Sequence, residues 1–276
     1  MSDSASEDAP GDSRLDAALA DRGIARSRTH ASRLVADALV SVDGVPALKP
    51  SLRVRPDQDI TVAGLDHYVS RAAHKLLGAL DSFPTVRVRG AHALDVGAST
   101  GGFSQVLLER GAASVIALDV GHAQLAPRIR SDERVHVVEG FNARDMTAAS
   151  LAAAARTAVV PDLVVSDVSF ISLTMVLPAV AACVDPLADF VVLVKPQFEV
   201  GRTGVKEGIV RDPELRREAL SDVLWAAWDL GLGVVGLVSS PLPGSAGNHE
   251  YLAHLHRDRG TIPTEWRDAV TALTIG

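Results

Sequence analysis

The sequence contains very little cysteine and few aromatic residues. Cys183 is the one cysteine among 276 residues, so an intrachain disulfide and a thiolate metal cluster are both excluded. Aromatic residues make up 4% of the chain and hydrophobic residues 47%, so aliphatic side chains must fill a sizeable core. This aliphatic bias is typical of buried parallel strands that are flanked by helices.

Long apolar runs and a targeting segment are also lacking. No apolar stretch approaches the roughly 20 residues that a membrane-spanning helix needs. Residues 1–13 are polar and acidic, without the charged and then apolar order of a signal peptide. Histidine and carboxylate residues show no paired spacing that suggests a metal site. We therefore expect a cytoplasmic protein that has an acidic flexible tail and uses neither a membrane nor a metal.

Positive charge is scarce overall but not locally. The formal net charge is −7, which taken alone disfavours a nucleic-acid partner. From Arg14 to Arg55, however, eight Lys or Arg residues accompany four Asp or Glu residues, a local excess of four positive charges. The distribution of charge therefore leaves room for an RNA partner near the N-terminus.

The first sixty residues predict a small mixed module. Residues 14–22 predict a short helix that stops at Gly23, and Ser27 is a plausible N-cap for a second helix that runs to about residue 38. Residues 39–45 predict a strand that runs into an Asp-Gly turn, and residues 59–63 a last strand.

Arginines gather around the start of the predicted second helix. Cations at a helix start oppose the helix dipole, and contact with phosphate would give their position a reason. The alternative is a solvated helical face. The candidate RNA-binding residues, including one at the start of a later helix, are Arg14, Arg22, Arg26, Arg28, Arg33 and Arg71.

An apolar segment from residue 91 onward ends in a glycine-rich turn. It contains Asp95, Gly97, Gly101 and Gly102, and a helix is predicted from Phe103 to about residue 110. Glycines allow close approach of a ligand to the backbone, and a helix start favours negative charge. The spacing differs from the dinucleotide-binding pattern G-x-G-x-x-G. An ordinary structural turn is the alternative.

Four further strands are predicted after the glycine-rich turn, and each ends in or is followed by polar groups. Ligands of doubly wound folds bind at the carboxyl ends of parallel strands, where such groups collect. Asp119 and Asp167 have a simpler alternative, the N-cap of a following helix. In chain order the predicted strands and their polar groups are residues 114–119 with Asp119, 134–139 with the loop Asn142–Asp145, 162–167 with Asp167, and 190–194 with Lys195.

Two lysines and two acids form a candidate catalytic set. A lysine that is held near another cation and near acids can serve as a general base. Lys75 alone has the alternative of a surface lysine. The set is Lys75, Asp167, Lys195 and Glu250, and its order matches the Lys-Asp-Lys-Glu tetrad of FtsJ-like ribose 2′-O-methyltransferases. By analogy Lys195 is the base, with the other three in support.

The N-terminal pattern of Arg14-Leu15-Asp16, Gly23, Ser27-Arg28 and Val42-Asp43-Gly44 resembles the S4-like RNA-binding domain. The whole chain closely resembles the TlyA family of rRNA ribose methyltransferases, whose members are also called hemolysins. The motifs that carry this second resemblance are Ser70–Leu76, Gly97–Phe103, Ser166–Leu173 and Val194–Gly201.

The resemblance implies an α/β fold: a class I Rossmann-like methyltransferase domain with a mixed, mostly parallel seven-stranded sheet, over residues 68–276. A linker at 64–67 and an S4-like domain at 14–63 would precede it. It also implies S-adenosylmethionine as cofactor and methylation of cytidine 2′-hydroxyls in 16S rRNA, 23S rRNA or both, as bare RNA or in ribosomal subunits. The implied cofactor-binding residues are Asp95, Gly97, Ala98, Ser99, Thr100, Gly101, Gly102, Phe103, Asp119, Val120, Asn142, Ala143 and Asp167.

Three other functions are weighed against this one: a membrane-active hemolysin, an inactive RNA-binding assembly factor, and methylation of a base at nitrogen or at carbon 5. A membrane-active hemolysin would need an amphipathic or spanning segment, and an inactive RNA-binding assembly factor would not need the intact glycines and acids. Base-nitrogen methyltransferases commonly carry an Asn/Asp-Pro-Pro-aromatic motif where this chain has Asp167-Val168-Ser169-Phe170. Carbon-5 methylation would have to use Cys183, which we expect within a helix as a core residue.

Overall fold

The computed structural model describes residues 12–25, 27–37, 39–62, 67–201, 204–205, 207–244 and 247–275. The chain divides into two compact units, with the boundary between Tyr68 and Val69. Most of the expected acidic tail, most of the expected linker and the candidate residue Arg26 lie outside the described residues.

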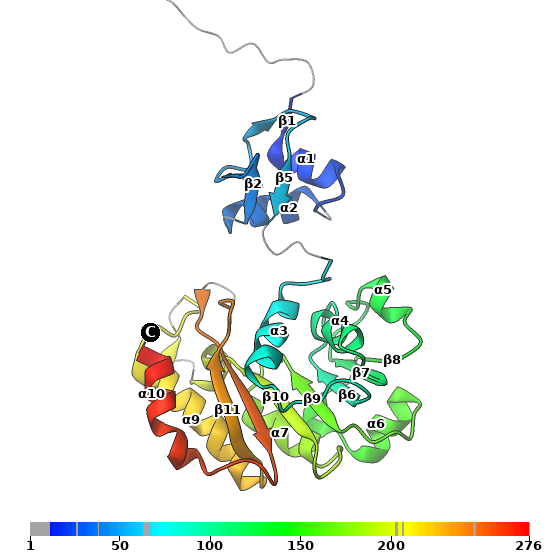
Figure 1. Ribbon diagram of the computed structural model, residues 1–276, viewed down its shortest axis with the longest axis vertical. Coiled ribbons are helices and arrows are strands. Elements are labelled where there is room, and N and C mark those ends of the chain that lie inside the picture. The colour runs from blue at the N-terminus through cyan, green and yellow to red at the C-terminus, as the bar shows by residue number, and fades with distance from the viewer. Residues whose placement is uncertain are drawn as a thin grey trace, which may run out of the picture. The chain divides into compact units, whose positions relative to one another are not determined.

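The described part of the first unit packs two helices against short strands (Figure 1). The predicted N-cap is confirmed, because Ser27 Oγ accepts a hydrogen bond from the His30 backbone N–H at 3.2 Å. Asp43 and Gly44 both have positive φ and turn the chain between antiparallel strands. The elements are α1 (Leu15–Asp21), α2 (Arg28–Ala36), a sheet of β3 (Val45–Pro46), β2 (Val40–Val42) and β5 (Ile60–Val62), and the pair β1 (Ser13–Arg14) and β4 (Arg53–Val54).

In the described part of the second unit, seven strands form one sheet in the order β11-β12-β10-β9-β6-β7-β8. The strands run parallel except for β12, which is antiparallel to both of its neighbours. This order confirms the predicted fold class. The strands are β6 (His92–Val96), β7 (Ser114–Asp119), β8 (Val135–Glu139), β9 (Leu163–Ser166), β10 (Asp189–Val194), β11 (Gly233–Ser239) and β12 (Tyr251–His256).

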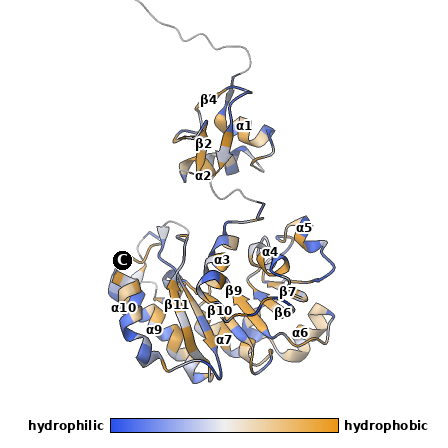
Figure 2. Ribbon diagram, in the orientation of Figure 1, coloured by the Kyte–Doolittle hydropathy of each residue, from blue (hydrophilic) through white to orange (hydrophobic). Residues whose placement is uncertain are grey.

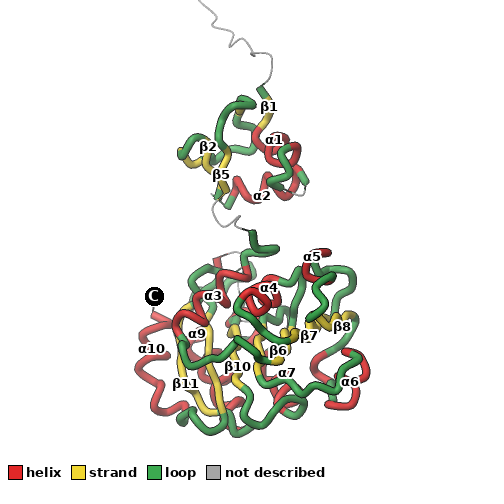
Figure 3. Tube along the Cα trace, turned by 45° about the vertical axis from the view of Figure 1, so that its right-hand side comes forward, coloured by secondary structure: helices red, strands yellow, loops and turns green. Residues whose placement is uncertain are grey.

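Helices cover both faces of this sheet (Figures 1 and 3). Leu94 and Val96 of β6 enter a core shared with α6, α7, α9 and α10, while Asp95 points to the opposite face and accepts a hydrogen bond from α4. The helices are α3 (Ala72–Ser82), α4 (Gly102–Glu109), α5 (Pro127–Arg130), α6 (Ala148–Ala155), α7 (Leu173–Ala181), α8 (Pro196–Glu199), α9 (Pro213–Asp229) and α10 (Arg267–Ile275), with 3₁₀ turns η1 (Ala143–Asp145) and η4 (Pro263–Trp266).

The order of the strands fixes where a ligand binds. From β6 the chain adds β7 and β8 on one side, and then crosses to β9 and β10 on the other. A crevice opens at the carboxyl ends of the strands where the order reverses, here β6 and β9. In Figure 2 the strands at the centre of this unit carry much of the orange colour that marks hydrophobic residues. None of the helices in the described ranges is long and apolar enough to cross a membrane.

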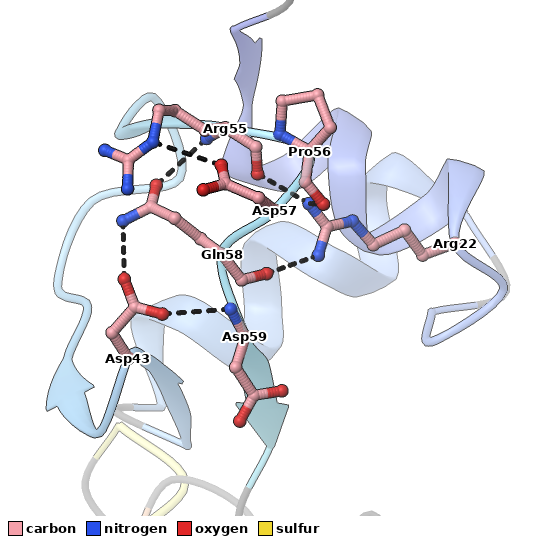
Figure 4. A network of polar contacts seen from close by, with 7 residues as sticks. All are labelled: Arg22, Asp43, Arg55, Pro56, Asp57, Gln58 and Asp59. Carbon is pink, nitrogen blue, oxygen red and sulfur yellow. Dashed lines mark hydrogen bonds and ion pairs between the residues drawn. The ribbon is translucent and has the colours of Figure 1, made fainter.

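A polar network joins α1 to the turn before β5 in the first unit (Figure 4). The Arg22 guanidinium donates to the backbone carbonyl oxygens of Gln58 at 2.8 Å, Arg55 at 2.8 Å and Pro56 at 3.2 Å. The Asp43 carboxylate accepts from the Gln58 side chain at 2.8 Å and from the Asp59 N–H at 2.9 Å. Arg22 therefore holds this turn in place, and its role in RNA binding stays a prediction.

The network predicts a structural role for Arg22 that Arg33 does not share. We expect Arg22→Ala to destabilise the first unit by about 1–2 kcal/mol, because hydrogen bonds to backbone carbonyls are lost. Amide hydrogen exchange at residues 55–59 should become faster, while exposed Arg33→Ala should change stability by less than about 0.5 kcal/mol. Equal exchange in the wild type and in Arg22→Ala would contradict this role.

Candidate active site

The glycine-rich turn after β6 lies directly against the segment that follows β9. Gly97 has φ +87°, and a Cβ on it would lie 2.7 Å from the Asp167 carbonyl oxygen. Gly102 starts α4, and a Cβ there would lie 2.2 Å from Ser70 Oγ. Glycine is therefore required at position 97, where the positive φ and the close backbone oxygen both exclude a side chain, whereas at position 102 the nearest atom belongs to the Ser70 side chain. The turn leaves a cradle at the end of the sheet.

Two cavities lie along this cradle. The larger, of about 530 Å³, extends past Asp119 towards Asn142, and the smaller, of about 210 Å³, extends past Thr100 towards Lys195. The predicted cofactor residues that line the larger cavity are Gly97, Ser99, Asp119, Val120, Asn142, Ala143 and Asp167. Those that line the smaller one are Gly97, Ala98, Ser99, Thr100, Gly102, Phe103 and Asp167. Asp95 and Gly101 line neither.

Asp119, at the end of β7, ties two loops of the larger cavity together. One carboxylate oxygen accepts the Ser99 N–H at 2.8 Å and the other accepts the Gly121 N–H at 2.7 Å. A carboxylate has about four acceptor positions, so two remain for hydroxyl groups of a ligand. The neighbouring Asn142 caps the turn η1, since its Oδ1 accepts the Arg144 N–H at 3.1 Å.

Glu139, at the end of β8, supports the wall of the same cavity. Its carboxylate accepts from Arg130 at 2.5 Å and from the Gln124 N–H at 3.2 Å, and the Arg130 hydrogen bond lowers the pKa of Glu139 to about 2. Gln124 in turn accepts a hydrogen bond from Ser99 Oγ at 3.2 Å. The glycine-rich turn and the loop after β7 are thus held by one connected set of bonds.

Asp95 lies underneath the turn, completely buried. Its Oδ2 accepts a hydrogen bond from Ser104 Oγ of α4 at 2.6 Å. Burial, together with a smaller effect of the nearby carboxylates of Asp167 and Asp119, raises the pKa of Asp95 to about 7. Asp95 therefore links β6 to α4 beneath the cavity, and direct contact with a cofactor stays a prediction.

The four candidate catalytic residues meet at the carboxyl ends of the strands. Val194 of β10 pairs with Tyr251 of the antiparallel strand β12. The adjoining residues, Lys195 after β10 and Glu250 before β12, therefore lie opposite each other. The Lys195 Nζ lies 2.5 Å from Asp167 Oδ1, and the Lys75 Nζ of α3 lies 2.5 Å from Glu250 Oε2. The sequence positions of these pairs are far apart, and the sheet register brings them together.

These ion pairs are largely removed from water. The exposed fractions are 9% for Lys75, 8% for Lys195 and 4% for Glu250, so Lys75 is not a surface lysine. Buried ammonium and carboxylate groups are tolerated when they are paired and hydrogen-bonded. Further bonds complete the set, from Lys195 Nζ to Ser169 Oγ at 2.8 Å and from Gln197 Nε2 to Glu250 Oε1 at 3.1 Å.

Sequence reasoning missed three groups of this site. Ser169 lines both cavities and contacts Lys195, and Gln197 contacts Glu250. Phe170 is 93% exposed with φ +66°, and its ring centroid lies 5.2 Å from that of Phe198. Their only sequence signal was their place beside Asp167 and Lys195 in the two motifs.

The candidate RNA-binding arginines differ in their surroundings. Arg14 and Arg28 both approach the carboxylate of buried Asp16, at 3.0 Å and 3.5 Å. Arg33 and Arg71 are exposed, on α2 and at the start of α3. Their contact with RNA stays a prediction.

Cys183 is buried, as expected, but the prediction that it lies within a helix is wrong. Helix α7 ends at Ala181, and Cys183 lies in the turn that follows, where its N–H donates to the Val180 carbonyl oxygen at 2.9 Å. Neither cavity is lined by Cys183.

The buried Asp95 predicts how the stability of the chain depends on pH. Between about pH 4 and 7 the folded state keeps a proton that the unfolded state has lost, so the free energy of unfolding should fall as pH rises. We expect Asp95→Asn to remove up to about 1.4 kcal/mol per pH unit of this slope. Urea unfolding of both proteins at several pH values measures it, and identical slopes would contradict the assignment.

Comparison with known proteins agrees with this geometry. The family of FtsJ-like methyltransferases matches residues 68–257, and the S4 domain family matches residues 13–60. A protein from Mycobacterium tuberculosis named 16S/23S rRNA (cytidine-2′-O)-methyltransferase TlyA is 47% identical over 262 residues, which cover 93% of this chain and 95% of that relative. Hemolysin A from Brachyspira hyodysenteriae is 40% identical over 87% of this chain and 98% of its own length.

A solved structure is also similar. A protein from Streptococcus thermophilus, provisionally named a hemolysin, has a TM-score of 0.74 and 36% identity, and 96% of each chain is covered. The chain therefore belongs to the TlyA family, in which an S4 domain precedes an FtsJ-like methyltransferase domain.

Proposed function

We propose that this chain transfers a methyl group from S-adenosylmethionine to the ribose 2′-hydroxyl of cytidine in ribosomal RNA, in both 16S and 23S rRNA. One observation carries the proposal: Asp167 lines both cavities and also forms the ion pair with Lys195. The relative from M. tuberculosis, named for both rRNAs, supports the choice of substrate. The activity would lie in the cytoplasm, where ribosomal subunits are found.

The residues of the cradle fit the cofactor. Backbone N–H groups at the start of α4 and the polar turn before it suit a carboxylate, and the free acceptor positions of Asp119 suit ribose hydroxyls. Lys195 and Asp167 both line the smaller cavity, so a ligand that fills both cavities would reach the ion pair between them. When bound, S-adenosylmethionine supplies an electrophilic methyl group on a sulfonium centre.

Lys195 is the base in this proposal. In its neutral form, Lys195 Nζ would take up the proton that the 2′-hydroxyl loses when its oxygen accepts the methyl group that the bound cofactor would supply. Asp167 and Ser169 hold Nζ from two directions, which leaves another direction for the hydroxyl. The Lys75–Glu250 pair holds Glu250 in place at the end of the strand next to β10, opposite Lys195.

Phe170 offers a contact surface for the acceptor nucleoside. Its ring is exposed, lines the larger cavity and lies against Phe198, whose ring centroid is 5.9 Å from Lys195 Nζ. Unstacked RNA bases commonly stack on aromatic side chains. A base on Phe170 would carry its ribose towards the lysine.

Methyl transfer to purified ribosomal subunits tests the proposed function. Tritiated S-adenosylmethionine is incubated with unmethylated small and large subunits, and the labelled RNA is digested and mapped. We expect label in 2′-O-methylcytidine, and a loss of about 10²- to 10⁴-fold in kcat for Lys195→Ala. Lys195→Arg keeps the positive charge beside Asp167 but cannot act as a neutral base, so it should be equally inactive.

Other outcomes would contradict the proposal. Label on the base, or full activity of Lys195→Ala, would contradict ribose methylation by this lysine. Cofactor binding without transfer to either subunit would mean that the substrate is wrong, and no cofactor binding would favour an RNA-binding assembly factor. Leakage of liposomes caused by the purified chain would favour the hemolysin alternative.

The positive φ and the exposed ring of Phe170 predict that one substitution can raise the stability of the fold and lower the activity. Phe170→Gly should raise the free energy of unfolding by about 1 kcal/mol, because glycine adopts positive φ without strain. The same change should lower kcat/KM for RNA about tenfold, since stacking contributes about 1–3 kcal/mol per base. Phe170→Tyr keeps the ring and should retain activity. Full activity of Phe170→Gly would contradict the stacking role.

A further inference from the structure

Several contacts join the segment after β9 to the segment after β10. Lys195 contacts both Asp167 and Ser169, and the Phe170 ring lies against the Phe198 ring. All of these contacts belong to the proposed active site. A further contact joins the same two segments from outside the site, through the carboxylate of Glu199.

Glu199 is the last residue of α8, and it caps the start of α7. Its Oε1 accepts the Leu173 N–H at 2.9 Å, and its Oε2 accepts the Ser172 hydroxyl at 2.5 Å. Ser172 is itself the N-cap of α7, because its Oγ accepts the Thr174 N–H at 3.1 Å. A carboxylate at this position satisfies free N–H groups and suits the positive end of the helix dipole.

This bond fixes the far end of the loop 168–172. Asp167, before the loop, is held by Lys195, and Ser172, its last residue, is held by Glu199. Phe170 between them has φ +66° and is almost fully exposed, so burial of its side chain does not offset the backbone strain. Such a conformation persists only where the surrounding contacts impose it. The two ends of the loop supply those contacts.

The carboxylate of Glu199 carries an electrostatic cost beside its capping role. Burial raises the pKa of its carboxyl in spite of the two hydrogen bonds, and the nearby carboxylate of Asp222 in α9 raises it further. A raised pKa means that the ionised group is less favourable in the fold than in water. Groups that are costly to bury and lie beside an active site are often kept for function.

We propose that Glu199 is a positioning residue of the methyltransferase, which holds the loop 168–172 so that Ser169 and Phe170 face Lys195 and the acceptor nucleoside. This inference deepens the proposed function and rests on it. Glu199 acts through the loop and does not itself touch the reacting atoms.

Two substitutions test the positioning role. Glu199→Ala removes both bonds, and we expect kcat to fall about 10- to 100-fold, because small misplacements at an active site cost about that much. The Kd for S-adenosylmethionine should change less than about threefold, since most of the cavity wall comes from other segments. Glu199→Gln can accept the Leu173 N–H and donate to Ser172 Oγ, so it should restore kcat to within about threefold of the wild type.

A matched control lies at the other end of the sheet. Asp162 also accepts a backbone N–H from a separate element, that of His92 at 2.7 Å, but before the start of β9. Asp162→Ala should lower stability and leave kcat unchanged. Wild-type kcat in Glu199→Ala, or a Glu199→Gln protein as inactive as Glu199→Ala, would overturn the proposal.

Amide hydrogen exchange tests the same proposal without any methyl transfer. Glu199→Ala should speed exchange at residues 168–173, and Glu199→Gln should not. Unchanged exchange in Glu199→Ala would overturn the positioning role even if the wild type is active. A wild-type chain that holds this loop through Glu199 but transfers no methyl group would instead contradict the proposed function alone.

Discussion

Two lysine ammonium groups lie buried at the carboxyl ends of the sheet, and each needs a carboxylate in direct contact. Lys195 forms an ion pair with Asp167, which follows β9, and Lys75 forms one with Glu250, which precedes β12. Removing one partner of such a pair leaves a buried charge, at a cost of about 3–5 kcal/mol. The register of three strands and the docking of α3 must therefore be maintained together, and the same register holds the groups that the chemistry needs.

The glycine-rich turn joins this charged cluster to the cofactor cavities. Gly97 packs against the backbone of Asp167, so the wall of both cavities and the ion pair with Lys195 are parts of one segment. Alignment of a methyl donor with a hydroxyl is the main catalytic requirement of an in-line transfer. The same chain also carries an S4 domain, which belongs to a family of RNA-binding domains. Such a domain suits an enzyme whose methyl acceptor is a large RNA. Fold and proposed chemistry thus depend on the same few contacts.

Hydrophobic runs and the polar residues after them predicted the strands β6 to β10, while β11 and β12 were expected only through the resemblance to a seven-stranded fold. Contacts that depend on side-chain direction were not predictable in this way. The pairing of Lys75 with Glu250, 175 positions apart, could be suggested only by resemblance to a known tetrad. Glu199 gave no signal, since capping of a distant helix depends on tertiary packing. Arg22 looked like a phosphate ligand in the sequence, yet its guanidinium holds the backbone of a turn.

In the proposed reaction, the ribose hydroxyl of a cytidine is the methyl acceptor at Lys195. Once the labelled cytidine is mapped, an rRNA carrying 2′-deoxycytidine at that position alone can be assembled into subunits. The measurement is single-turnover methyl transfer to this rRNA and to its unmodified counterpart, with binding measured in parallel. We expect equal binding and no transfer to the deoxy substrate. Transfer at the normal rate would contradict the proposed reaction, because the methyl group would then have another acceptor atom.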